Sequence, residues 1–146
     1  YLILFSSALE LILENIIIMN KLVMDVANEK IFLMVITKDN IYNITKENTK
    51  INYEKLTLIV KDFLNSNSLK LEHIHKIYVN RGPGSFAGIR NSLSLVKAFN
   101  VARKIDYYCY SLEDFKDQKD VKYEDIPNLC DKFKIKKNLI KPIYLS

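Results

Sequence analysis

The sequence predicts an α/β protein in which helices pack on a mixed β-sheet. Three observations support this fold class: short β-branched and aromatic runs separated by turn residues, two longer runs with apolar residues at helical spacing, and a glycine-rich loop between a strand and a helix. The expected order of elements is β-β-β-α-β-α-β. The predicted strands cover 22–26, 31–37, 41–45, 74–79 and 107–110, and the predicted helices cover 53–65 and 89–104.

The first three strands are expected to form an antiparallel meander. Asp39 and Asn40 offer a hairpin turn between the second and third strands. Asn52 is the expected N-cap of helix 53–65. The apolar residues of this helix share one arc of the helical wheel, as in a helix packed on a sheet. Leu58 falls on the opposite, polar side.

Helix 89–104 is apolar over more of its surface than one sheet face requires. The strand before it, 74–79, has a continuous apolar centre, which is typical of a strand covered on both faces. Packing on one sheet face needs an apolar stripe of only about 100°, so the excess on the helix predicts a second burying surface, either the neighbouring helix or another protein. The candidate interface residues are Leu58, Leu95, Phe99 and Ala102.

The composition indicates a single globular domain. The chain has 146 residues, of which 49% are hydrophobic and 27% charged, and a formal net charge of +5. Taken in large blocks this charge is evenly spread, unlike the concentrated stripe of a nucleic-acid binder. Cys109 and Cys130 are expected to be reduced thiols. His73 and His75 have no cluster of Cys or carboxylates beside them, so no metal site is predicted.

The two ends differ from the central pattern. Residues 1–18 are apolar, carry Glu10 and Glu14 and contain no basic residue, which fits neither a signal peptide nor a spanning helix. They are expected to be a non-core N-terminal extension before a start at Met19. Residues 116–137 are expected to form a solvated, loosely ordered connection, and 140–145 an extended edge segment.

All three glycines of the chain lie in the loop 81–90, RGPGSFAGIR. A strand, a glycine loop and a helix start can bind an anion through free backbone N–H groups. The loop lacks the lysine of a P-loop and the flanking glycines of a serine-hydrolase elbow, and a dinucleotide-binding fingerprint fits poorly. Ser85 is expected to cap the helix. The residues predicted near a bound anion or nucleotide are Asp25, Arg81, Gly82, Pro83, Gly84, Ser85, Gly88 and Arg90.

The segment VNRGPGSFAGIRNSLSLVKAF at 79–99 is similar to the signature of the TsaB family (the YeaZ-type subunit), where a strand leads into an R-G-P-G-S-F-T-G-L-R loop and then a helix. Only Ala87 and Ile89 depart from the core of that signature. The segments 19–25, 52–56 and 111–113 also resemble the family at corresponding places, and 142–145 does so weakly.

The resemblance implies the N-terminal lobe of an actin-like ATPase (ASKHA, ribonuclease H-like) fold over 19–115, with 116–146 as a short tail in place of a second lobe. It also implies a role in making threonylcarbamoyladenosine in tRNA in the bacterial cytoplasm. In the family this subunit is not the catalyst. It binds the TsaD transferase through the two helices of its N-terminal domain, and TsaE joins the assembly.

One departure bears on activity. The Asp-Thr-Ser that follows the first strand in the family is here Asp25-Val26-Ala27, which lacks both hydroxyls that could bond a phosphate or a metal-bound water. We therefore expect no catalytic residue, no required cofactor and at most weak ATP or ADP binding. The expected partner is a TsaD-like transferase in a heterodimer, with a TsaE-like ATPase in the larger assembly. A homodimer is a further possibility, tRNA is expected to be contacted only indirectly, and no membrane contact is expected. The alternative is an actin-like nucleotide-binding enzyme with its own ATPase, kinase or peptidase activity.

Overall fold

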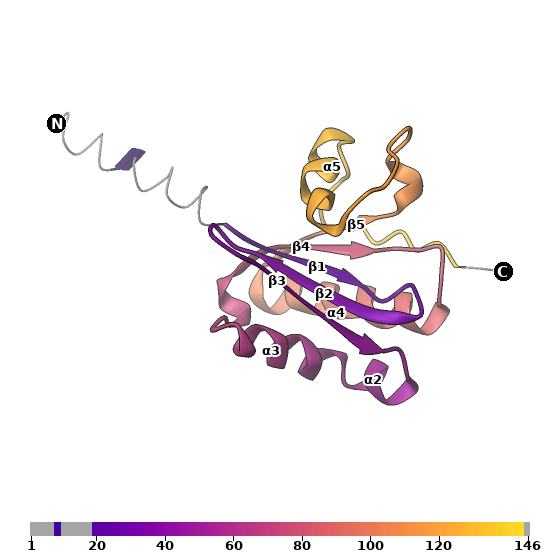
Figure 1. Cartoon of the computed structure of the whole chain (residues 1–146), viewed down its shortest axis with the longest axis horizontal. Helices are drawn as coiled ribbons and strands as arrows, with labels where there is room; N and C mark the ends of the chain where they lie inside the picture. Colours follow the sequence, from indigo (N-terminus) through magenta and orange to yellow (C-terminus); the bar gives the residue numbers. More distant parts are fainter. Residues whose placement is uncertain (1–7, 10–18, 145–146) are drawn as a thin grey trace.

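A five-stranded sheet with strand order β3-β2-β1-β4-β5 forms the centre of the computed structural model, which describes residues 8–9 and 19–144 (Figure 1). The strands are β1 (Asn20–Asp25), β2 (Lys30–Ile36), β3 (Ile41–Glu47), β4 (Ile74–Asn80) and β5 (Asp106–Tyr110). The α-helices are α2 (Lys50–Glu54), α3 (Leu56–Ser66), α4 (Phe86–Arg103) and α5 (Ile126–Lys132). Three short 3₁₀ turns are η1 (Leu71–His73), η2 (Leu112–Asp114) and η3 (Tyr123–Asp125).

The pairing confirms the predicted mixed sheet. β1 pairs antiparallel with β2, and β2 with β3, with a turn in which the Thr37 N–H donates to the Asn40 carbonyl at 2.9 Å. β1 and β4 are parallel, as are β4 and β5. The order β-β-β-α-β-α-β holds from β1 to β5, with two helices in place of the first predicted one and α5 added after β5. The carboxyl ends of β1, β4 and β5 meet at one edge.

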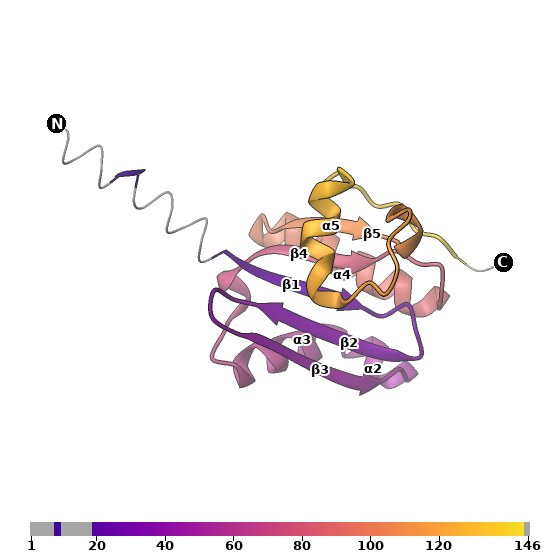
Figure 2. The ribbon, with the colours of Figure 1, turned by 45° about the horizontal axis from the view of Figure 1, so that its top comes forward.

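Helices cover both faces of this sheet. α2, α3 and α4 lie on one side, and α5 lies on the other (Figures 1 and 2). Alternate residues of a strand supply the two cores: Leu22 and Met24 of β1 pack toward α3 and α4, while Val23 packs toward α5. In β4, Val79 joins the first core and Tyr78 the second. The expectation that this strand is covered on both faces is confirmed.

The first predicted helix is divided, and its cap is wrong. Two helices, α2 and α3, replace the single helix 53–65, because Lys55 leaves helical geometry at φ −101°, ψ 14°. Thr49 is the N-cap of α2, and its hydroxyl accepts a hydrogen bond from the Asn52 N–H at 3.2 Å. The Asn52 side chain instead donates to the carbonyl of Glu47 at 2.6 Å.

The expectation of a solvated connection at 116–137 is wrong for the stretch around α5, whereas 116–120 is exposed as expected. α5 buries Ile126 and Cys130, each 1% exposed, against the face of the sheet that α2, α3 and α4 leave open. The second core also contains Tyr78, Tyr110 and Phe115. α5 is thus the second helical layer of this fold.

The predicted N-terminal extension, 1–18, lies outside the described residues except for 8–9. In the part of the chain that the structure describes, no helix combines the length and apolar character needed to cross a membrane.

Candidate functional site at the glycine loop

The loop between β4 and α4 lies at the edge where the parallel strands end. Ligands of open α/β sheets bind in the crevice outside these carboxyl ends, and here an open groove of about 1020 Å³ borders the loop. The groove is lined by Ala27, Asn28, Glu29, Lys30, Phe32, Thr45, Asn48, Tyr53, Pro83, Gly84, Ser85 and Tyr123.

Two of the glycines are required by the backbone around them. Gly82 has φ +108°, a conformation that side chains rarely adopt, and a Cβ there would also meet the carbonyl of Ile143. A Cβ at Gly88 would meet the carbonyl of Val26, the residue that follows β1. Gly88 therefore lets the first turn of α4 approach the sheet closely.

Ser85 connects the loop to both neighbouring elements. Its hydroxyl accepts a hydrogen bond from the Gly88 N–H at 3.2 Å, which confirms the predicted helix cap. The same hydroxyl lies 3.0 Å from the Tyr53 hydroxyl of α2, and the Ser85 N–H donates to the Ala27 carbonyl at 2.9 Å. The groups that a loop serine could offer to an anion are thus engaged within the chain.

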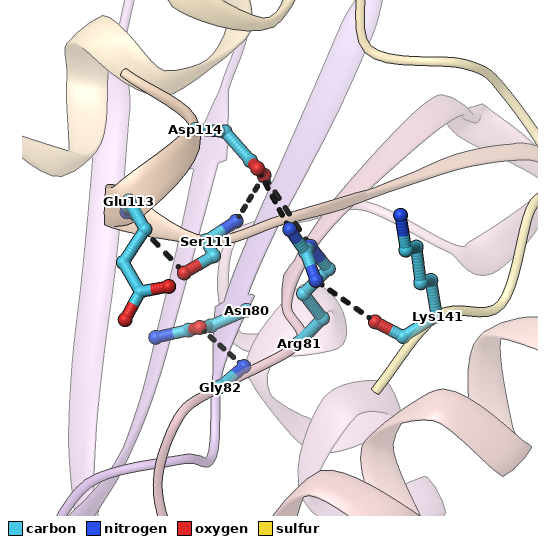
Figure 3. Close-up of polar contacts among 7 residues, drawn as sticks. All are labelled: Asn80, Arg81, Gly82, Ser111, Glu113, Asp114 and Lys141. Carbon is cyan, nitrogen blue, oxygen red and sulfur yellow. Dashed lines mark hydrogen bonds and ion pairs between the residues drawn. The ribbon is translucent and has the colours of Figure 1, made fainter. Parts of the chain in front are cut away.

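Arg81 is part of an internal ion pair (Figure 3). Its Nη2 lies 2.7 Å from Asp114 Oδ1, its Nε donates to Asp114 Oδ2 at 3.3 Å, and its Nη1 donates to the Lys141 carbonyl at 3.1 Å. Asp114 also accepts from the Ser111 N–H at 2.8 Å. The side chains of Arg81 and Asp114 are only 11% and 21% exposed. Through these contacts Arg81 connects the end of β4 to η2 and to the C-terminal segment.

Asp25 is buried and fully engaged at the end of β1. It is 3% exposed, and its Oδ1 accepts from the Ala27 N–H at 3.1 Å. Its Oδ2 accepts from Asn28 Nδ2 at 2.9 Å and from the Tyr123 hydroxyl at 2.7 Å. Burial, followed by the nearby Asp25 charge, raises the pKa of Tyr123 well above its ordinary value, so this hydroxyl stays a donor.

The remaining groove residues supply few groups for chemistry. Pro83 and Gly84 line the groove, and Arg90 is exposed on the first turns of α4. Lys30 lies 3.8 Å from Glu47 in an exposed pair. Among the described residues, no group of three His, Cys, Asp or Glu side chains could hold a metal ion. The groove has the position of a ligand site, and the charged residues that line it are Glu29 and Lys30.

The comparisons with known proteins agree with this fold. The family described as TsaD, tRNA N6-adenosine threonylcarbamoyltransferase, matches residues 47–111. The solved structure of YeaZ from Pseudomonas aeruginosa superposes with a TM-score of 0.59 at 20% identity, covering 64% of this chain and 44% of that one. The described domain is TsaB-like in fold. This confirms the resemblance drawn from the loop.

A second solved structure supports the same conclusion. It is an uncharacterized protein with similarity to peptidase YeaZ from Pseudomonas aeruginosa, with a TM-score of 0.59 and 20% identity over 64% of this chain and 43% of that one. The chain therefore spans less than half the length of the structures it matches. No curated protein matches the sequence significantly.

The TsaB-like domain uses two of its four predicted interface residues in its own core. Leu95 and Phe99 of α4 are 9% and 6% exposed and belong to the first core. Most of the wide apolar face of this helix is therefore buried within the chain. This corrects their assignment as interface anchors. Leu58 is 53% exposed on α3, and Ala102 is exposed on α4.

Three residues of the site, Asn80, Asp114 and Tyr123, were not predicted from the sequence. Asn80 accepts a hydrogen bond from the Gly82 N–H at 2.9 Å, and an Asn immediately before a loop is a recognisable signal for such a turn. Asp114 forms a capping box with Ser111. That pattern is a sequence signal for the turn η2, but it does not predict the pairing of Asp114 with Arg81. Tyr123 lies in a lysine-rich segment with no local signal for a contact to Asp25.

Proposed function

We propose that this chain is a non-catalytic accessory subunit that supports a TsaD-like transferase in making threonylcarbamoyladenosine in tRNA. The observation that carries the proposal is the engagement of Asp25, Arg81 and Ser85 by partners within the chain. Phosphoryl chemistry needs metal and phosphate ligands held at the substrate, and these three groups hold the fold together instead. The match of residues 47–111 to the family described as tRNA N6-adenosine threonylcarbamoyltransferase supports tRNA modification as the process in which such a subunit acts.

We assign no cofactor to this chain. The groove beside the loop offers amide and hydroxyl groups from Asn28, Thr45 and Tyr53 and one paired cation, Lys30. Such a lining supports weak ATP or ADP binding at most. In the cell, the proposed assembly is cytoplasmic and includes a TsaE-like ATPase.

The exposed surface of α3 and α4 is the proposed contact with the transferase. Ala98, Val101 and Ala102 lie at helical spacing and are exposed on α4, with Val101 at 73%. Leu58 is exposed on the neighbouring α3. Small side chains at the contact allow two helices to approach closely, and Leu58 supplies an apolar anchor at the side.

Co-expression with the TsaD-like protein of the same organism tests this proposal. The wild-type chain is expected to co-purify with the transferase, and Leu58→Glu and Ala102→Glu are each expected to weaken the complex at least tenfold. Asn43→Glu is the matched control, because Asn43 is exposed on β3 and lies between Tyr42 and Ile44, which point to the opposite face of the sheet.

The three variants must retain the wild-type urea midpoint for the comparison to hold. A complex that survives both substitutions on α3 and α4, or that Asn43→Glu weakens equally, would contradict the proposed contact. A chain that never co-purifies with the transferase would contradict the subunit role. Light scattering of the isolated chain separately measures whether the same face forms a homodimer.

A further inference from the structure

The C-terminal segment concentrates the charge of the chain. Residues 132–146 contain five lysines and no acidic residue, and the whole chain has a formal net charge of +5. The other residues of the chain are therefore balanced in charge. Over longer blocks the charge is even, because acidic residues at 117–131 offset the lysines that follow them.

The fold leaves the lysines of this segment exposed. Phe133 and Ile135 pack against the second core, whereas Lys132, at the end of α5, and Lys134 and Lys136, in the turn and extended stretch that follow, are exposed. None of these three lysines makes a salt bridge to any described residue. Their ammonium groups are thus available to a partner.

Backbone contacts keep this segment along the β5 edge of the sheet. The Ile135 N–H donates to the Cys130 carbonyl at 2.9 Å, and the Asn138 N–H donates to the Tyr107 carbonyl at 2.7 Å. Further on, the Lys141 carbonyl accepts from Arg81 at 3.1 Å (Figure 3). The lysines are carried on an ordered backbone that runs from α5 to the glycine loop (Figure 2).

An exposed aromatic pair stands at the loop end of this segment. Phe86 and Tyr144 are 57% and 40% exposed, with ring centroids 4.7 Å apart and planes tilted by 48°. Tyr144 is placed there by a bridge to Gly84. Exposed lysines and an exposed aromatic ring on one ordered segment are components of a surface for unpaired nucleic acid, where phosphates meet lysines and bases stack on aromatic rings.

We propose that Lys132, Lys134, Lys136, Lys141, Phe86 and Tyr144 form a basic edge that binds RNA directly. The lysines contact the phosphate backbone and the aromatic pair stacks with an unpaired base. This differs from the expectation that tRNA is contacted only indirectly. RNA is favoured over a membrane surface because the cations lie along an edge segment and end at tilted rings, whereas membrane-surface helices place cations opposite a broad apolar face.

Fluorescence anisotropy of the full chain with two labelled RNAs tests the basic edge. The probes are a short hairpin with a single-stranded loop and a blunt duplex with the same number of phosphates. The variant Lys132→Gln/Lys134→Gln/Lys136→Gln is expected to bind the hairpin about tenfold or more weakly. Because each lost phosphate contact lowers the salt slope of log K by about 0.7–0.9, the slope should fall by about 2.

A matched variant removes the same charge elsewhere. Lys38→Gln/Lys46→Gln/Lys61→Gln changes three exposed lysines outside the segment and should alter hairpin affinity less than about twofold. Equal losses in the two triple variants, or no loss in either, would overturn the proposal. All variants are compared by their urea midpoints, so that a folding defect is recognised.

The aromatic pair has a separate readout. Phe86→Ala is expected to weaken binding to the hairpin about fivefold or more, since stacking contributes about 1–3 kcal/mol per base, and to leave duplex binding unchanged. Equal loss on both RNAs would overturn the stacking role.

A membrane surface is the alternative ligand. Absence of RNA binding, together with binding to phosphatidylserine vesicles that depends on the three lysines, would assign the edge to a membrane surface and overturn the RNA proposal. These measurements use the chain alone, so their outcome is independent of the transferase.

Discussion

Gly88 is the residue on which α4 docks against β1. A methyl group at this position would meet the Val26 carbonyl and approach the Tyr53 ring at 3.2 Å. Since overpacking a well-packed site costs about 1–3 kcal/mol, Gly88→Ala is expected to lower the free energy of unfolding by at least that amount. Urea denaturation measures it, with the exposed Ala87→Ser in the same turn as control. An unchanged midpoint for Gly88→Ala would show that the helix can move away from the strand at little cost.

Cys109 and Cys130 are buried thiols on opposite faces of the sheet. Burial raises the pKa of each to about 12. A thiol is nucleophilic only as the thiolate, so neither should react with Ellman's reagent at pH 8 until the chain unfolds in urea. Rapid reaction of the native protein would contradict this burial.

The same two thiols set the sign of a pH effect on stability. In the unfolded chain they ionise near their ordinary pKa of about 8.5, whereas in the folded chain they stay protonated to about pH 12. The unfolded state therefore binds fewer protons above about pH 8.5, and the free energy of unfolding should decrease from there toward pH 12. Replacing both cysteines by alanine should reduce this slope, and an unaltered slope would contradict the assignment.

At the level of elements, α5 is the least expected feature and a structural one. Ile126 is 1% exposed against Tyr78 and Tyr110 of the sheet. Because removing a buried Ile side chain costs about 2–5 kcal/mol, Ile126→Ala should destabilise the chain by that amount, whereas Asn128→Ala on the exposed side of α5 should change stability by less than about 0.5 kcal/mol. Similar urea midpoints for the two variants would show that α5 is only loosely attached.

The elements differ in how far the sequence predicts them. The strands and α4 follow from apolar periodicity, which is strong in uninterrupted runs. α5 carried weaker signals: Ile126, Leu129, Cys130 and Phe133 have helical spacing, and Pro127 suits a helix start. The surrounding lysines concealed that pattern. No local sequence signal predicts the break at Lys55, where α2, which begins at the Thr49 cap, ends.

At the scale of the whole molecule, the site depends on contacts between distant parts of the chain. The loop residues and the helix cap at Ser85 were predictable, because strand, loop and helix are adjacent in sequence. The pairs Arg81–Asp114 and Tyr123–Asp25 join residues 33 and 98 positions apart. Local sequence patterns do not predict such pairs. Because these pairs engage Asp25 and Arg81, the loop is a junction between β1, β4 and the C-terminal segment and not the anion site that was expected.

We propose that this junction does not bind nucleotide as an enzyme does and instead places a partner-binding helix. Isothermal titration of MgATP into the purified chain tests it most directly, with hydrolysis followed in the same sample. The internal partners of Asp25 and Arg81 predict no binding in the micromolar range and no turnover. Micromolar binding accompanied by phosphate release would contradict the account and favour an actin-like ATPase.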